Sequence, residues 1–192
     1  MKPSLVITVL VLSSATASAQ DVCPEFANSV NAIIKGGTAG IELGLEDAAV
    51  KQEKKGLYRG WDSSIRLNNA NAKIAIKASK APPSFAFRPV NEAVHPRQQI
   101  KLYALVTKKQ YRELAVGGMN NWGGTKDKNS KDSSIELKFE KISKGCYKVT
   151  SAVELPPGQY AFSLGASPDV QGTNAGWGTT SQGQVWYGFS VK

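Results

Sequence analysis

The strongest constraint on the fold is a two-residue repeat of apolar side chains that returns throughout the second half of the chain. Every second residue is apolar along residues 100–106, 135–139, 160–164 and 185–191. Such a repeat places the apolar side chains on one face of a β-strand. Residues 112–116 read as the hairpin partner of the first of these segments. We therefore predict a β-sheet protein.

The whole chain contains about nine such segments, at spacings of roughly 8 to 15 residues, as in β-sandwiches and barrels. No long helical pattern separates them, which disfavours a parallel α/β sheet. The predicted fold is an all-β, immunoglobulin-like antiparallel β-sandwich of about nine strands. The strand near Phe85 directly follows Pro82 and Pro83, so it is predicted to be an edge strand or a fresh start.

One short helix is predicted near the start of this domain, within residues 24–35. Apolar residues from Phe26 to Ile34 recur at the spacing i, i+4, i+7 and i+8. Pro24 suits a first helical position, and the glycines at 36 and 37 suit a stop.

Residues 1–19 have the pattern of a secretory signal peptide. Lys2 is followed by a short apolar run and then by small residues that end in Ala17 and Ala19. We expect cleavage after Ala19, which leaves residues 20–192 as a single domain in the periplasm or outside the cell. No run is apolar and long enough for a transmembrane helix, so no membrane insertion is expected.

The chain contains two cysteines, Cys23 and Cys146. In an oxidising compartment they are predicted to pair. Two free buried thiols are the alternative.

The net charge of +9 becomes 23 − 15 = +8 without Lys2 of the signal segment. The basic residues are interleaved with acidic ones, as on solvated faces. This pattern lacks the concentrated basic surface that nucleic acids need. An anionic glycan or an envelope surface fits the charge better.

The segment Leu155 to Phe162 reads Leu-Pro-Pro-Gly-Gln-Tyr-Ala-Phe. Pro157 and Gly158 suit the centre of a type II turn. The segment resembles the tyrosine corner of immunoglobulin-like sandwiches, which implies that Tyr160 hydrogen-bonds to the upstream backbone and that Leu155 anchors the preceding strand. A phenylalanine stands where antibody domains have a cysteine, so the resemblance implies the topology without the antibody-type core.

A wider stretch, from Phe85 to Phe162, is similar to a group of uncharacterised bacterial exported proteins. The residues that carry this resemblance include Leu102-Tyr103, Arg112-Glu113-Leu114 and Val116-Gly117. It covers less than half of the mature chain. It implies a bacterial envelope or secreted setting and no particular reaction.

Two long loops, 117–133 and 165–183, are rich in glycine and asparagine, and each contains a tryptophan. An indole face can stack on a sugar, and neighbouring amides and hydroxyls can hydrogen-bond to it. The alternative is that each tryptophan folds back and closes an open end of the sandwich. The candidate ligand-binding residues are Asn120, Asn121, Trp122, Asn174, Trp177 and Thr179.

The other two tryptophans are predicted to be structural. Trp186 is expected to point to the opposite face from Val185 and Tyr187, and Trp61, beside Gly60, to be a core residue next to a turn.

No metal, cofactor or catalytic group is predicted. Asp127, Asn129 and Asp132 are interleaved with lysines and lack the offsets of a calcium loop. The single histidine, His95, has no Gly-x-Ser-x-Gly elbow to serve. A pair of acids from different strands stays open, and the nominal candidates are Glu46, Asp47, Glu92, Glu154 and Asp169.

Three functions follow from these patterns. The first is a non-catalytic exported binding protein that contacts a glycan or a protein through the two long loops. The second is a structural or accessory subunit of an envelope assembly, joined by sheet-edge pairing with the strand near Phe85 as the candidate edge. The third is a hydrolase on a β scaffold.

Overall fold

The computed structural model describes residues 22–34, 39–54, 60–119, 125–126, 134–165 and 184–192. These residues form mostly antiparallel β-sheet with one short helix, α1 (Pro96–Gln99). The prediction of an all-β fold is therefore confirmed. The described residues contain 15 strands rather than about nine. The strands that the sequence did not predict include two long ones, Ala48–Lys54 and Trp61–Asn68.

The strands form two sheets. The smaller sheet has five strands, in the order β12 (Leu137–Ser143), β13 (Cys146–Ser151), β7 (Ser84–Arg88), β1 (Ser29–Ile33) and β2 (Gly40–Glu42). The larger sheet has ten strands, and its main path is β3 (Leu45–Glu46), β15 (Val185–Val191), β14 (Gly158–Leu164), β8 (Ile100–Thr107), β9 (Tyr111–Met119), β5 (Trp61–Asn68) and β4 (Ala48–Lys54). Three short strands extend it: β10 (Thr125–Lys126) pairs with β9, β11 (Ser134–Ile135) with β8, and β6 (Ile74–Ile76) runs parallel to β15.

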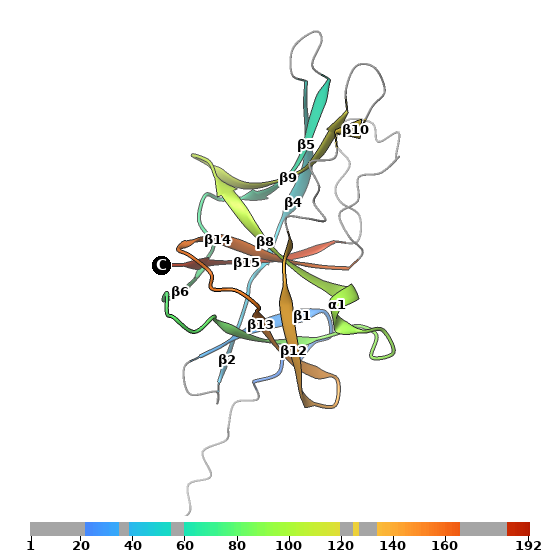
Figure 1. Ribbon diagram of the computed structural model, residues 1–192, viewed down its shortest axis with the longest axis vertical. Coiled ribbons are helices and arrows are strands. Elements are labelled where there is room, and N and C mark those ends of the chain that lie inside the picture. The colour runs from blue at the N-terminus through green and yellow to red at the C-terminus, as the bar shows by residue number, and fades with distance from the viewer. Residues whose placement is uncertain (1–21, 35–38, 55–59, 120–124, 127–133, 166–183) are drawn as a thin grey trace, which may run out of the picture.

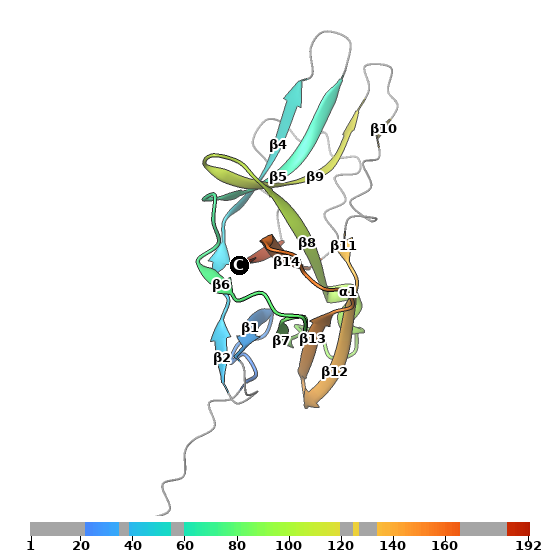
Figure 2. The same cartoon turned by 60° about the vertical axis from the view of Figure 1, so that its left-hand side comes forward.

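The larger sheet curls instead of forming one flat layer. β8 pairs with β14 along residues 100–105 and with β9 at Val106 and Thr107, so the sheet turns at this strand. Strands β4, β5 and β9 leave the body of the molecule together, and we call these three strands the arm (Figures 1 and 2). Because of this curl, the nine-strand immunoglobulin-like sandwich is not confirmed.

The central strands β14 and β15 are buried on both faces. Along β15, Tyr187 and Phe189 point into one apolar core, while Trp186 packs in a second core. In β14, Phe162 packs in the same core as Tyr187 and Phe189, and Ala161 packs in the same core as Trp186. Trp186 thus points away from Tyr187, as the two-residue repeat predicts.

The first core lies between the smaller sheet and the central strands. Its centre is aromatic: the ring centroid of Phe85 on β7 lies 4.8 Å from those of both Phe162 and Phe189. The second core lies between the central strands and the arm, where Ile65 and Leu114 pack with Trp186. The central strands therefore have an apolar layer on each side.

The predicted N-terminal helix over residues 24–35 is wrong, because residues 29–33 form strand β1. This strand lies between β2 and β7, so both of its edges are hydrogen-bonded in the sheet. Val30 and Ala32 face the first core with a period of two, while Phe26 stays 65% exposed. Asn28, with φ of 60°, lies just before β1 and is incompatible with a continuous right-handed helix.

Of the two alternatives predicted for the strand near Phe85, the edge strand is wrong and the fresh start after the prolines is confirmed. β7 lies inside the smaller sheet, paired with β13 on one side and with β1 on the other. Pro82 and Pro83 precede the first residue of the strand, so they leave its hydrogen-bond ladder intact.

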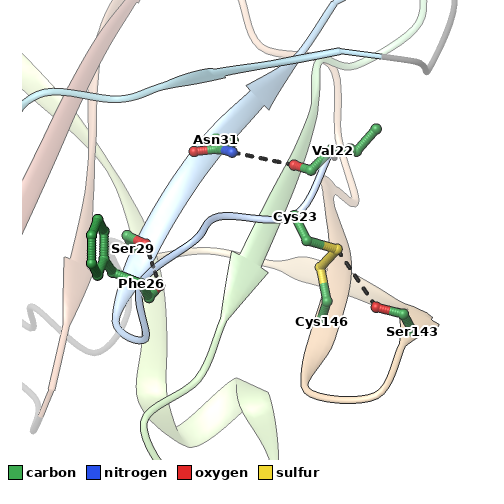
Figure 3. Close-up of a disulfide and its surroundings, with 7 residues drawn as sticks. All are labelled: Val22, Cys23, Phe26, Ser29, Asn31, Ser143 and Cys146. Carbon is green, nitrogen blue, oxygen red and sulfur yellow. Dashed lines mark hydrogen bonds between the residues drawn. A yellow bond between two sulfur atoms is a disulfide. The ribbon is translucent and has the colours of Figure 1, made fainter. Parts of the chain in front are cut away.

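The predicted disulfide between Cys23 and Cys146 is confirmed. Both residues are buried, their Cα atoms lie 6.1 Å apart, and they are separated by 123 residues in sequence. The bridge joins the segment before β1 to the start of β13 (Figure 3). It thereby ties the segment before β1 to β13, which lies on the other side of β7.

Among the described residues, no helix is both long and apolar enough to cross a membrane.

We expect the double variant Cys23→Ser/Cys146→Ser to lose about 2–5 kcal/mol of unfolding free energy, because a bridge that closes a long loop restricts the unfolded chain. Urea denaturation followed by tryptophan fluorescence would measure this loss. Wild-type protein treated with dithiothreitol is the control and should unfold at the same urea concentration as the variant. A variant as stable as the oxidised wild type would contradict this expectation.

Candidate functional site

The six predicted ligand-binding residues, Asn120, Asn121, Trp122, Asn174, Trp177 and Thr179, lie outside the described residues. The structure does describe where their loops are attached. The predicted first loop, 117–133, is wrong in part, because residues 117–119 belong to β9 and β10 pairs with the end of β9. The chain is next described at Ser134. The second loop connects the end of β14 to the start of β15.

The attachment points of the two loops lie on either side of β8. Ser134, at the end of the first loop, pairs with Tyr103 of β8. Leu164, at the start of the second loop, pairs with Ile100 of the same strand. Since Tyr103 and Ile100 are three residues apart, these attachment points are separated by about 10 Å along the strand. The fold therefore brings the C-terminal end of the first loop near the start of the second, while the N-terminal end of the first loop, at Met119, lies at the outer end of the arm.

Trp61 is not the core residue that the sequence predicts. It opens β5 at the outer end of the arm, and 36% of its surface is exposed. Its neighbours in register are Lys54 of β4 and Met119 of β9. Met119 is also the last residue of β9 before the first loop continues, so an exposed indole lies directly beside the base of that loop.

The outer end of the arm also carries a cation. The Nζ atom of Lys54 lies 5.9 Å from the centroid of the Trp61 ring. The ammonium group lies over the ring as a cation–π contact. A sugar that stacks on this indole would therefore use the other face of the ring. Trp61 shares its side of the sheet with Ile65, which reaches the second core. Trp61 is exposed all the same, because it lies at the outer end of the arm, beyond the second core.

Tyr160 makes the backbone hydrogen bond that the resemblance implies. Its hydroxyl donates to the carbonyl oxygen of Pro156 at 2.6 Å, and Leu155 is buried in the first core. Burial raises the pKa of the Tyr160 hydroxyl. A Cβ atom on Gly158 would lie 3.5 Å from the Tyr160 ring. Gly158 is the first residue of β14 and lacks the positive φ of a type II turn, so that turn prediction is wrong. The group of Leu155, Gly158 and Tyr160 is structural.

A buried ion pair joins the arm to the central strands. Arg112 of β9 donates to the carboxylate of Glu46 on β3, and the Arg112 and Glu46 side chains are 1% and 9% exposed. Arg112 also donates from Nε to the carbonyl oxygen of Asn69 at 3.0 Å, and from Nη2 to that of Asn68 at 3.3 Å. The sequence did not predict this pair, because its members are 66 residues apart.

Gly188 of β15 provides the space that this ion pair occupies. A Cβ atom on Gly188 would overlap the carboxylate of Glu46 and would approach Nη1 of Arg112 to 2.8 Å. A glycine inside an otherwise apolar strand is the one sequence signal that marks a close approach here.

Two buried N–H donors in this part of the fold lack a hydrogen-bond acceptor within the described structure. Among the described residues, neither Nη1 of Arg112 nor Nε1 of Trp186 has a hydrogen-bond partner, although both atoms are buried. A buried donor without a partner costs about 1–3 kcal/mol. The cluster therefore contributes less stability than its number of hydrogen bonds implies.

Burial decides the ionisation of Glu46. Desolvation raises the pKa of this carboxyl, and the opposing attraction of Arg112 and of the more distant Lys73 does not cancel it. This balance is usual for an ion pair removed from water, where the loss of hydration can exceed the attraction.

The remaining candidate acids do not form a comparable group. Asp47, Glu92 and Glu154 are exposed, and Asp169 lies outside the described residues. His95 caps α1, where its Nδ1 accepts from the backbone N–H of Arg97 at 3.2 Å. In the part of the chain that the structure describes, no three His, Cys, Asp or Glu side chains gather closely enough to hold a metal ion. Asp127, Asn129 and Asp132 lie outside that part.

Comparison of the chain with protein-family models, with curated proteins and with solved structures gave no match.

We expect Arg112→Met to lower the unfolding free energy by about 3–5 kcal/mol, because it leaves the Glu46 carboxylate buried without its partner. Arg66→Met is the matched control: Arg66 also lies in the arm and pairs with Glu53 and Glu113, but it is partly exposed. The control should lose about 1 kcal/mol or less. Urea denaturation at neutral pH would measure both losses, and equal losses would show that burial of the Arg112 pair has no special weight.

The raised pKa of Glu46 also predicts a pH dependence. The fold favours the neutral carboxyl, so the contribution of this group to stability is complete below its ordinary pKa of 4.5 and is lost as the pH rises through the folded-state pKa. In Glu46→Gln, the same site cannot ionise. We therefore expect the unfolding free energy of wild type minus that of Glu46→Gln to fall as the pH rises above 4.5, as urea denaturation at a series of pH values would show. A difference that rises with pH would mean that Arg112 outweighs burial.

Proposed function

We propose that this chain is a non-catalytic exported protein that binds a glycan or an envelope protein through loops 117–133 and 165–183. The observation that supports this role best is the exposed Trp61, which lies beside the base of the first loop. The ligand surface would then comprise the two loops and the outer end of the arm.

A glycan with acidic groups is the ligand class that this surface favours. Lys54 places a positive charge over one face of the Trp61 ring, and a sugar would stack on the other face. The mature chain has a net charge of +8, so anionic ligands would also be attracted over a longer range. The asparagines and tryptophans predicted for the loops would add hydrogen bonds and further stacking.

Export to an oxidising compartment is part of the proposal. The buried disulfide supports it, because such bridges persist outside the reducing cytosol. An immunoglobulin-like relationship is proposed on the hydrogen bond between Tyr160 and Pro156. Among the described residues, no observation favours the hydrolase.

We expect Trp61→Ala to weaken glycan binding about three- to tenfold, which corresponds to the loss of one aromatic contact. The ligand would first be found on an array of bacterial glycans and would then be titrated against each variant. Trp122→Ala and Trp177→Ala test the two loops in the same way.

Phe26→Ala is the control, since Phe26 is an exposed aromatic residue just before β1, which is a strand of the smaller sheet. It should bind like wild type. Equal affinity of wild type and all three tryptophan variants would show that neither the arm nor the loops form the glycan-binding surface.

A further inference from the structure

Strand β4 presents an unusually long and regular free edge. It pairs with β5 residue by residue from Ala48 to Lys54, without a register shift. Among the described residues, no strand pairs with its other side. Its unpaired backbone N–H and C=O groups are therefore available to an additional strand.

The other terminal strands of the two sheets are shorter or irregular. β2 has three residues and β3 has two. β12 is as long as β4, but its register shifts between Lys141 and Ser143, and Arg97 of α1 pairs with Glu136 just before it. Short strands and bulges are common means of preventing edge pairing. Neither is present in β4.

The position of β4 leaves room for a partner. The strand runs along one side of the arm, away from β10 on the other side (Figure 2). Residues 51–54 are all exposed. A second protein could approach this edge without displacing the central strands.

We propose that β4 pairs antiparallel with β4 of a second copy of this chain, with Gln52 on the two-fold axis. In this register Lys51 lies directly opposite Glu53 of the second copy, and the symmetry repeats the pair. Directly opposite charges of unlike sign stabilise antiparallel strands. The two glutamines face each other on the opposite side of the sheet.

The charges select this register over its neighbours. A two-fold axis at residue 51 would place Lys51 opposite itself, and an axis at residue 53 would place Glu53 opposite itself. Like charges directly opposite each other are destabilising. The two-fold symmetry is the usual one for a dimer of identical chains.

The side chains are free to make these contacts. The Glu53 side chain is 63% exposed, and it meets Arg66 of its own chain through one carboxylate oxygen. Lys51 has no ion-pair partner among the described residues. This inference is argued from the free edge and the charges of β4 and does not depend on the glycan-binding role, although Lys54 of β4 also contacts the Trp61 ring.

Cross-linking of Gln52→Cys tests the register. The described residues contain no free cysteine, so within them the new residue is the single free thiol. In the dimer, the two Cβ atoms at position 52 would lie about 5 Å apart, within reach of a short bismaleimide. Ser63→Cys is the matched control: Ser63 is the β5 neighbour of Gln52, and its two copies would be about 14 Å apart, three strand spacings.

We expect Gln52→Cys to cross-link into dimers much faster than Ser63→Cys. Wild-type protein should show a mass that rises from monomer to dimer with concentration in light scattering. Lys51→Glu should raise the dissociation constant about tenfold or more, because two attractions become repulsions. Lys51→Glu/Glu53→Lys should restore dimerisation.

A wild-type protein that stays monomeric at all concentrations would overturn the proposal. So would equal cross-linking of Gln52→Cys and Ser63→Cys, or a Lys51→Glu variant that dimerises like wild type. Circular dichroism would confirm that each variant is folded, as the exposure of residues 51–54 leads us to expect.

Discussion

The burial of both faces of β14 and β15 is the constraint on which the rest of the structure depends. A sheet with one apolar face needs a single covering layer, but these strands carry large apolar side chains on both. The five-stranded sheet covers one face, and the larger sheet has to curl at β8 to bring the arm over the other. The curl is therefore a consequence of side-chain pattern in two strands.

The ion pair of Arg112 and Glu46 lies where that curl closes. It connects β9 of the arm to β3 at the other end of the larger sheet's path, and Gly188 leaves the space for it. An apolar contact would satisfy burial at lower electrostatic cost. The ion pair instead requires one particular arrangement of its donors and acceptors, so we regard it as a device that fixes where the arm meets the central strands.

The two-residue repeat predicted what each strand does locally, and it failed where distant segments decide. It predicted the all-β class, the hairpin of β8 and β9, and the opposite orientations of Trp186 and Tyr187. We predicted a helix for β1, because the spacing from Phe26 to Ile34 fits 3.6 residues per turn. The pairing of β1 with β2 and β7 cannot be seen in the local sequence. The exposure of Trp61 depends on how far the arm extends, and the burial of Glu46 depends on an arginine 66 residues away. The predicted loop residues lie outside the described residues, so that part of the site stays a prediction.

The place of β15 in the larger sheet has a consequence for biosynthesis. This strand, which ends at Val191, lies between β3 and β14 and contributes to both cores. A ribosome delivers the chain from its N-terminus, and long-range strand pairing is intrinsically slow. Neither core can be completed before β15 has been synthesised, so the apolar strands that precede it lack one of their partners until then.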